Sequence, residues 1–309
     1  MPQVDLPNAL PNAERLSVFV HGVARRAATR VGQWELVELA AEGALADLYA
    51  ARPAGGGARR AAQYAIKILR REREEDPRAV GMLRREALVG RTVSHPHLIS
   101  ILSAAVASPP YYVVMPWLAG ATLATMLAGG RAIEWLAALW ITRQVAEALD
   151  ALHEAGWVHG DVKPGNVFVS PEGHATLLDL GFARRSEGEE PAVERCVTGT
   201  WHYMAPETFS SRPRADARSD LYSLGVVLFE MLSGRPPFAG ASATELARQH
   251  RDARIPGLAE VAAPLPDDAR VLLRQMLSKE PLRRPQTPRE VVQRLVAVEI
   301  ASLAGRMRD

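Results

Sequence analysis

The hydrophobic pattern of the chain changes near residue 120, and this change constrains the fold more than any other feature. From Trp34 to about Leu118, apolar residues form four short strand-like runs, WELVEL, ADLYAA, QYAIKIL and YYVVMPW. One helical stretch, from about Pro77 to Val93, interrupts them. Beyond Gly120 the apolar spacing is mostly helical, with stretches from Ile133 to His153, around Leu221–Leu232, near Ala269–Leu277 and from Pro288 to Leu303. The pattern predicts an α+β chain with a small, sheet-rich lobe followed by a larger, mainly helical lobe.

Composition narrows the class of protein. The 309 residues are 48% hydrophobic, enough to bury a sizeable core, and 37 Lys and Arg residues balance 35 Asp and Glu residues. This balance argues against a nucleic-acid partner bound by bulk charge. The start of the chain lacks the pattern of a signal peptide, no apolar run approaches the ~18 residues of a membrane span, and a single cysteine, Cys196, excludes an internal disulfide. We therefore expect a cytoplasmic protein without a membrane span.

Residues 1–33 are interpreted as an N-terminal extension. After Asn12, apolar residues such as Leu16, Phe19 and Val23 recur at helical spacing with arginines opposite them. This spacing predicts a short amphipathic helix. The helix could pack on its own domain, or it could dock on a partner protein or a membrane surface.

The most informative stretch is VHGDVKPGNVFV, which is followed by LLDLGFA. Asp161 and Asn166 lie on one short predicted loop after a long helix, and Asp179 follows a strand-like segment. Two carboxylates and an amide supply the hard oxygen ligands that Mg²⁺ prefers, whereas they suit zinc poorly. This set of side chains is typical of phosphoryl transfer.

Further motifs appear in a fixed order around this stretch: AIK, RREALVGRTVSHPHLI and MPWLAG before it, and GTWHYMAPE, SDLYSLGVVLFEMLSGRPPF and PLRRP after it. With these motifs the chain resembles the eukaryotic-like, Hanks-type serine/threonine protein kinases of bacteria. The resemblance implies the bilobal kinase fold over residues 34–305. Residues 34–118 would form the N-lobe, an antiparallel sheet with one helix, and residues 119–305 the mainly helical C-lobe.

The resemblance also assigns roles to individual residues. Lys67 would grip the α- and β-phosphates of ATP with Glu86 as its helix partner, and Asp161 would be the catalytic base. Lys163 would steady the γ-phosphate. Asn166 and Asp179 would hold Mg²⁺ or Mn²⁺. The implied ATP-binding residues are Ala41, Gly43, Ala46, Leu48, Ala65, Lys67, Met115, Pro116 and Leu118.

The resemblance places other residues around the substrate and the catalytic loop. Thr198 and Thr200 would belong to the activation segment beside a protein substrate, and Thr200 marks Ser/Thr specificity. Glu207 would pair with Arg284. Asp220 would brace the backbone of the catalytic loop.

Several positions depart from the family pattern. The glycine-rich phosphate loop is AEGALA and keeps only the central Gly43, which predicts weakened ATP affinity. HRD becomes HGD, so Gly160 replaces the arginine that pairs with a phosphate on the activation loop in relatives. We therefore expect activity without phosphorylation of that loop. Gly165 replaces an acidic residue that many relatives use to attract basic substrates.

Lysine is rare in this chain. Only Lys67, Lys163 and Lys279 are lysines among the 37 basic residues. Two of the three fall on the implied ATP site, where a compact ammonium suits phosphates better than a guanidinium does. Lys279 is interpreted as a surface residue.

The leading function is thus an ATP- and magnesium-dependent serine/threonine protein kinase acting on a protein substrate. A pseudokinase scaffold that binds nucleotide weakly or not at all is the alternative favoured by AEGALA and HGD. A small-molecule kinase of the aminoglycoside type shares the loop and metal residues but should lack GTWHYMAPE. A homodimer through the N-lobe, or a partner at the N-terminal helix, is a further possibility.

Overall fold

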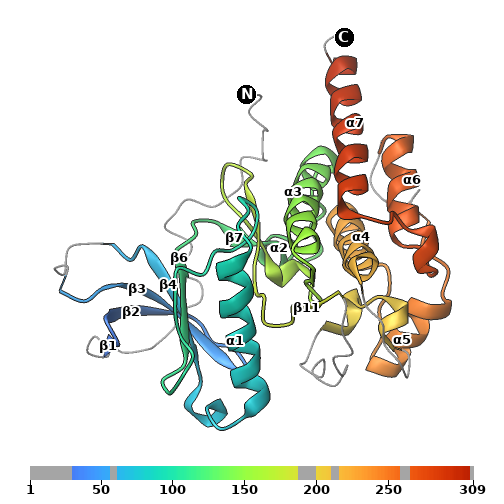
Figure 1. The fold of residues 1–309 in the computed structure, drawn as a ribbon. Coiled ribbons are helices and arrows are strands. Elements are labelled where there is room, and N and C mark those ends of the chain that lie inside the picture. Colours follow the sequence, from blue (N-terminus) through green and yellow to red (C-terminus); the bar gives the residue numbers. More distant parts are fainter. Residues whose placement is uncertain (1–29, 56–60, 187–199, 210–215, 258–264, 307–309) are drawn as a thin grey trace. The chain divides into compact units, whose positions relative to one another are not determined.

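The computed structural model describes residues 30–55, 61–186, 200–209, 216–257 and 265–306. The chain divides into two compact units (Figure 1). The first comprises Met1–Arg91 and Ser100–Ala119, and the second comprises Thr92–Ile99 and Gly120–Asp309. The predicted N-terminal helix lies outside the described residues.

The first unit is built on an antiparallel sheet with the strand order β1-β2-β3-β4-β6-β5. Its elements are β1 (Arg30–Val31), β2 (Trp34–Ala41), β3 (Ala46–Pro53), β4 (Tyr64–Leu69), α1 (Pro77–Thr92), β5 (Ser103–Ala105) and β6 (Tyr112–Pro116). Side chains alternate between the two faces of such a sheet, so each face has its own chemistry.

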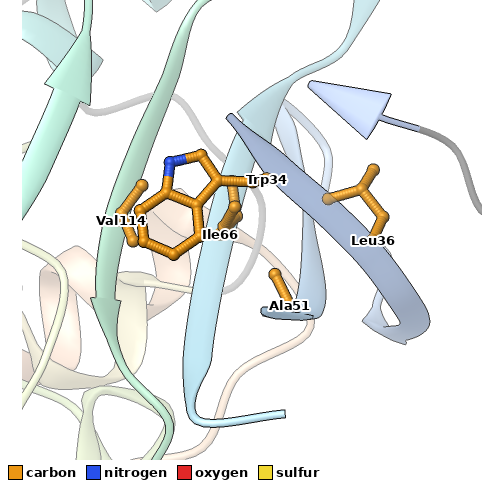
Figure 2. Close-up of a cluster of buried hydrophobic side chains, with 5 residues drawn as sticks. All are labelled: Trp34, Leu36, Ala51, Ile66 and Val114. Atoms are coloured by element: carbon orange, nitrogen blue, oxygen red, sulfur yellow. The ribbon is translucent and has the colours of Figure 1, made fainter. Parts of the chain in front are cut away.

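One face carries a hydrophobic cluster that we call the outer cluster: Trp34, Leu36, Ala51, Ile66 and Val114, from strands β2, β3, β4 and β6 (Figure 2). All five are buried. Because the side-chain period of a strand is two, Ala65 and Lys67 project from the opposite face. The outer cluster thereby fixes the register that carries Lys67 to the other face, because a one-residue slip would expose the cluster.

The second unit is mainly helical, and α3, α4 and α7 lie side by side in it (Figure 1). Its helices are α2 (Leu123–Met126), α3 (Trp135–Glu154), α4 (Ala217–Ser233), α5 (Ala243–Asp252), α6 (Asp267–Met276) and α7 (Pro288–Arg306). Short strands β7 (Ala121–Thr122), β9 (Val167–Val169) and β10 (Ala175–Leu177) form one small sheet, and β8 (Trp157–Val158) pairs with β11 (Arg184–Arg185).

Helix α4 begins and ends for local reasons. Asp216 caps its start, since its carboxylate accepts a hydrogen bond from the backbone N–H of Arg218. In return, the backbone N–H of Asp216 donates to the side-chain oxygen of Ser219. Within the helix, Gly225 permits a close approach to α6, because a Cβ there would lie 2.8 Å from the Cβ of Met276. The helix is apolar nearly all round and is buried accordingly.

The α+β pattern predicted from the sequence is confirmed. The strand-like runs correspond to β2, β3, β4 and β6, and the helical stretches to α1, α3, α4, α6 and α7. Helix α5 was not predicted, because only Leu246 and His250 of its ten residues are buried and the apolar signal is weak. In the part of the chain that the structure describes, no helix is long and apolar enough to cross a membrane.

Candidate active site

Lys67 and Glu86 form an ion pair in the first unit. The Lys67 Nζ lies 2.8 Å from Glu86 Oε2, and the Glu86 side chain is only 2% exposed against 25% for Lys67. Strand β4 supplies the lysine and helix α1 the glutamate. A carboxylate this buried needs a cationic partner, so the pair holds the lysine at a defined height above the sheet.

Sheet register places other predicted ATP-binding residues around Lys67. Leu48 on β3 is opposite Lys67, and Ala65 is opposite Met115 on β6. Residues paired directly across strands share a face, so these four side chains project from the side that carries Lys67. Pro116 ends β6 and Leu118 follows it, while Ala41 ends β2 and Ala46 begins β3.

In the second unit, three predicted residues converge on the loop after β8. The Lys163 Nζ lies 2.7 Å from Asp161 Oδ2. The Asn166 side-chain amide donates to the same oxygen at 2.9 Å and to the Asp161 backbone oxygen at 2.8 Å. The Asp161 side chain is 1% exposed, yet no described residue donates a hydrogen bond to its other oxygen, Oδ1.

An unpartnered carboxylate oxygen is costly in a buried position and therefore informative. Burial raises the pKa of Asp161, and the neighbouring Lys163 opposes that rise. Lys163 and Asn166 saturate one oxygen, so Oδ1 remains as an acceptor for a donor that approaches from outside the described chain. Such an arrangement suits a base that accepts the proton of a substrate hydroxyl.

Asp220 on α4 braces this loop, as the resemblance implied. Its Oδ2 and Oδ1 accept the backbone N–H groups of His159 and Gly160 at 2.7 and 2.8 Å. The His159 ring is fully buried; its Nδ1 accepts the Asp161 N–H at 3.2 Å, so its Nε2 carries the proton and donates to the Leu178 oxygen at 3.0 Å. These bonds hold the backbone on either side of Asp161.

The backbone at position 160 itself explains the glycine of the HGD motif. Gly160 has a φ of +78°, and a Cβ there would lie 2.9 Å from the Phe182 oxygen. Only glycine enters this backbone region without strain. The residue that removes the family's arginine thus also relieves a crowded backbone position.

Asp179 has an unusual backbone. It is the only non-glycine residue with positive φ in the described part of the chain, at +58°. Next to it, the Leu178 N–H donates to the backbone oxygen of Asn166 at 2.8 Å, and the Leu180 side chain is fully buried. Strain at a carboxylate that the surrounding structure holds in place is a signature of functional sites.

The chemistry of Asn166 and Asp179 fits a hard divalent cation. The side-chain NH₂ group of Asn166 donates to Asp161, so the side-chain oxygen Oδ1 of Asn166 remains as a possible metal ligand. Asp179 adds a carboxylate. No cluster of three or more His, Cys, Asp or Glu side chains in the described residues could hold a metal. Magnesium fits a two-residue oxygen set because it keeps several waters or phosphate oxygens as further ligands.

The predicted pair of Glu207 and Arg284 is present in the second unit. Two Arg284 nitrogens donate to the two Glu207 oxygens at 2.8 Å each, and the arginine side chain is fully buried. Burial alone would raise the pKa of Glu207, but the Arg284 guanidinium holds it below its usual value. Thr198 lies outside the described residues, and Thr200 begins a short 3₁₀ turn, Thr200–Tyr203.

Sequence reasoning missed Glu230. A pocket of about 350 Å³ beside Lys163 is lined by Ala124, Leu127, Ala128, Pro164, Gly165, Tyr203 and Glu230. The Tyr203 hydroxyl donates to Glu230 at 2.8 Å, and burial raises the pKa of this glutamate. Glu230 is a charged residue within the apolar run of α4, and this single charge is the only sign in the sequence that the position lines a pocket.

The interpretation of Lys279 as a surface residue is wrong. Its Nζ lies 4.0 Å from the centre of the Phe238 ring and donates to the Gln249 oxygen at 3.3 Å. Burial and the charge of Arg284 lower the pKa of Lys279 to about 8. The third lysine is thus a partly buried packing residue.

Comparison with known proteins agrees with this geometry. The family model described as "Protein kinase domain" matches residues 43–296. PrkC of Bacillus subtilis, a serine/threonine-protein kinase, is 31% identical over 74% of this chain and 35% of its own length. PknB of Mycolicibacterium smegmatis, also a serine/threonine-protein kinase, is 33% identical over 86% of this chain and 43% of its own.

A probable serine/threonine-protein kinase of Streptomyces coelicolor, SCO3848, is 35% identical over 71% of this chain and 33% of its own length. The chain therefore spans less than half the length of these relatives. Because the family model covers most of the chain in one continuous match, this chain belongs to the protein kinase domain family, beside the Hanks-type serine/threonine kinases of bacteria.

Proposed function

We propose that the chain is an active serine/threonine protein kinase that transfers the γ-phosphoryl group of ATP to protein hydroxyls. The observation that carries the proposal is the buried Asp161 carboxylate, which has one oxygen bound by Lys163 and Asn166 and the other without a partner in the described chain. The relatives named above support the substrate class, because their names give serine/threonine kinases.

Each residue would have a separate task. Lys67, held by Glu86, binds the α- and β-phosphates. Asp161 Oδ1 accepts or orients the substrate hydroxyl proton, and Lys163 stabilises negative charge at the γ-phosphate. Asn166 and Asp179 would hold Mg²⁺ or Mn²⁺, which supplies neutralisation of the phosphate charge when bound. Positioning and electrostatics then account for most of the rate.

The other ATP-binding residues follow from the face that carries Lys67. Leu48, Ala65 and Met115 offer apolar contacts for the adenine. Pro116 lacks an N–H, and the resemblance places the adenine contacts on its carbonyl and on the N–H of Leu118. Ala41, Gly43 and Ala46 would cover the phosphates. The cytoplasmic location, the dimer and the absence of a nucleic-acid partner stay predictions.

We further propose that activity needs no phosphate on the activation segment. Gly160 has no side chain to bind such a phosphate, and before Thr200 the segment offers only Ser186 and Thr198 as hydroxyl residues that could carry one. The pseudokinase alternative rests on AEGALA alone once Gly160 has this explanation. The intact set at Lys67, Asp161 and Asn166 favours an active enzyme.

The test is a phosphotransfer assay with radiolabelled ATP, Mg²⁺ or Mn²⁺ and myelin basic protein as a generic acceptor. We expect Asp161→Asn to lower kcat at least about 100-fold, and Lys67→Met to abolish turnover. The matched control is Lys279→Met, which removes the one lysine outside the site. Wild-type protein that binds ATP but labels no acceptor would indicate a pseudokinase, and full turnover by Asp161→Asn would refute the role of Asp161.

A further inference from the structure

In the first unit, hydrogen bonds join the middle of the phosphate loop to Asp47 and Arg70. The Gly43 N–H donates to the Asp47 carboxylate at 3.4 Å, and the Gly43 oxygen accepts from Arg70 Nη1 at 3.1 Å. The Arg70 guanidinium lies 4.0 Å from the same Asp47 carboxylate, and the Arg70 N–H donates to the Leu45 oxygen at 2.9 Å. We call Gly43, Asp47 and Arg70 the loop latch.

The turn inside the latch is tight. A Cβ at Gly43 would lie 2.4 Å from the Ala46 oxygen, a distance that real Cβ atoms do not reach. The closed turn therefore requires glycine at position 43 for its own geometry, apart from any contact with phosphate. This is a reason for Gly43 to persist in a loop whose other glycines have become alanine.

The latch turns the central amide toward the face of the outer cluster. Asp47 is paired with Ile68, and Tyr49 follows two residues later on the same strand. Asp47, Tyr49, Ile68 and Arg70 all line a pocket of about 460 Å³, and Tyr49 and Ile68 pack against the outer cluster. Lys67 and its partner Glu86 belong to the opposite face, because side chains alternate along β4.

The latch and a nucleotide compete for one donor. In the proposed function, Ala41, Gly43 and Ala46 cover the phosphates, and the backbone N–H of Gly43, the middle residue of the three, is a donor for them. In the closed loop a carboxylate, itself an anion, already accepts that N–H, and one N–H makes only one strong hydrogen bond. The triphosphate can bind this N–H only after the bond to Asp47 is broken. The apparent dissociation constant therefore equals the intrinsic one divided by the fraction of molecules in which this bond is broken.

We propose that the loop latch is an autoinhibitory device in which Asp47, held by Arg70, occupies the Gly43 amide and lowers the affinity of the chain for ATP. The inference rests on the proposed function, since it concerns the same nucleotide. Asp47 and Arg70 are positioning residues that act through Gly43. Loss of one charge-assisted hydrogen bond corresponds to about a three- to tenfold change in affinity.

The experiment measures ATP affinity by displacement of mant-ADP with Mg²⁺ present, together with kcat and KM. Asp47→Ala and Arg70→Gln should each tighten ATP binding and lower KM by about three- to tenfold, with kcat unchanged. The two variants change the net charge in opposite directions. Simple attraction of the triphosphate predicts weaker binding for Arg70→Gln, whereas the latch predicts tighter binding.

Glu42→Ala is the matched control, because Glu42 is an exposed acid on the same loop and is not a member of the latch. Its ATP affinity should stay within about twofold of wild type. Equal tightening by Glu42→Ala and Asp47→Ala would show a general charge effect and overturn the latch. Weaker binding by Asp47→Ala would show that the tether preorganises the loop, which also overturns it.

A readout without nucleotide separates this inference from the proposed function. The amide resonance of Gly43 in ¹⁵N-labelled full-length protein should shift in Asp47→Ala, which removes the acceptor of this N–H, and should stay in place in Glu42→Ala. If the shift is present but the wild type transfers no phosphate, the latch stands and the kinase proposal fails. If phosphotransfer is normal and Asp47→Ala leaves the Gly43 amide resonance unchanged, the latch alone fails.

Discussion

Replacement of Arg284 by leucine should destabilise the second unit strongly. The guanidinium donates five hydrogen bonds: two to Glu207 at 2.8 Å, and one each to the backbone oxygens of Ser278, Arg218 and Lys279 at 2.8, 2.9 and 3.0 Å. The arginine is fully buried, and the Glu207 side chain is 19% exposed. Leucine would leave a nearly buried carboxylate without its cation.

The magnitude follows from this burial. Removal of one partner of a buried ion pair costs about 3–5 kcal/mol, because the other charge stays desolvated. Ser219 still donates to Glu207 at 2.6 Å, and water can reach a carboxylate that is partly exposed, so we expect the lower half of that range. The free energy of unfolding should therefore fall by about 3–4 kcal/mol.

The measurement is urea denaturation followed by circular dichroism at neutral pH, with Arg283→Leu as the matched control. Arg283 is the preceding residue; its side chain is 74% exposed and its pair with Glu280, at 2.9 Å, lies in solvent. Loss of that pair should cost no more than about 1 kcal/mol. Equal losses for Arg283→Leu and Arg284→Leu would refute the reasoning from burial.

The same pair sets a pH dependence whose sign can be worked out. Arg284 holds the pKa of Glu207 below its usual value in the folded chain, so the folded state favours the ionised carboxylate. The stabilisation is therefore complete above the pKa of glutamate in the unfolded chain, about 4.3, and is lost as the pH falls through the lower folded value. The stability difference between wild type and Arg284→Leu should narrow below about pH 4.3, and a constant difference down to pH 3 would contradict the assignment.

Two further predictions concern activity. Because burial raises the pKa of Asp161 and only its ionised form can accept a proton, the acid limb of the kcat profile should lie above the ordinary aspartate value of about 3.9, and a limb at or below that value would count against Asp161 as the base. The double variant Ser186→Ala with Thr198→Ala, and wild-type protein treated with phosphatase, should retain kcat within about twofold, since Gly160 cannot bind an activating phosphate; a loss of tenfold or more in the phosphotransfer assay would show that the activation segment must be phosphorylated.

Local patterns were sufficient for much of this chain. The strand and helix periodicities gave the α+β class because one face or stripe of each element must be buried. The spacing of Asp161, Asn166 and Asp179 pointed to a hard-cation site because loops of this length bring such side chains together. Asp220 and the pair of Glu207 and Arg284 were reachable only through the resemblance, since 60 or more residues separate each from its partner.

Other features depended on contacts that no local pattern encodes. Segment Thr92–Ile99 begins at the last residue of α1 but belongs to the second unit, where the Ile99 N–H donates to the Leu177 backbone oxygen at 2.9 Å. Glu230 and Lys279 looked like ordinary charges in the sequence, and their burial comes from Tyr203 and Phe238, which lie far from them along the chain.

The sequence by itself determined the class of fold and which residues are predicted to react, because periodicity and residue chemistry are local properties. Only the tertiary structure decided how those groups are used. Among the described residues it left Asp161 Oδ1 without a hydrogen-bond partner, whereas Lys163 and Asn166 both bind Oδ2, and it placed the Gly43 N–H on Asp47. Burial and hydrogen-bond competition belong to the whole fold, and they determine which of the residues that carry the chemistry are available to a ligand.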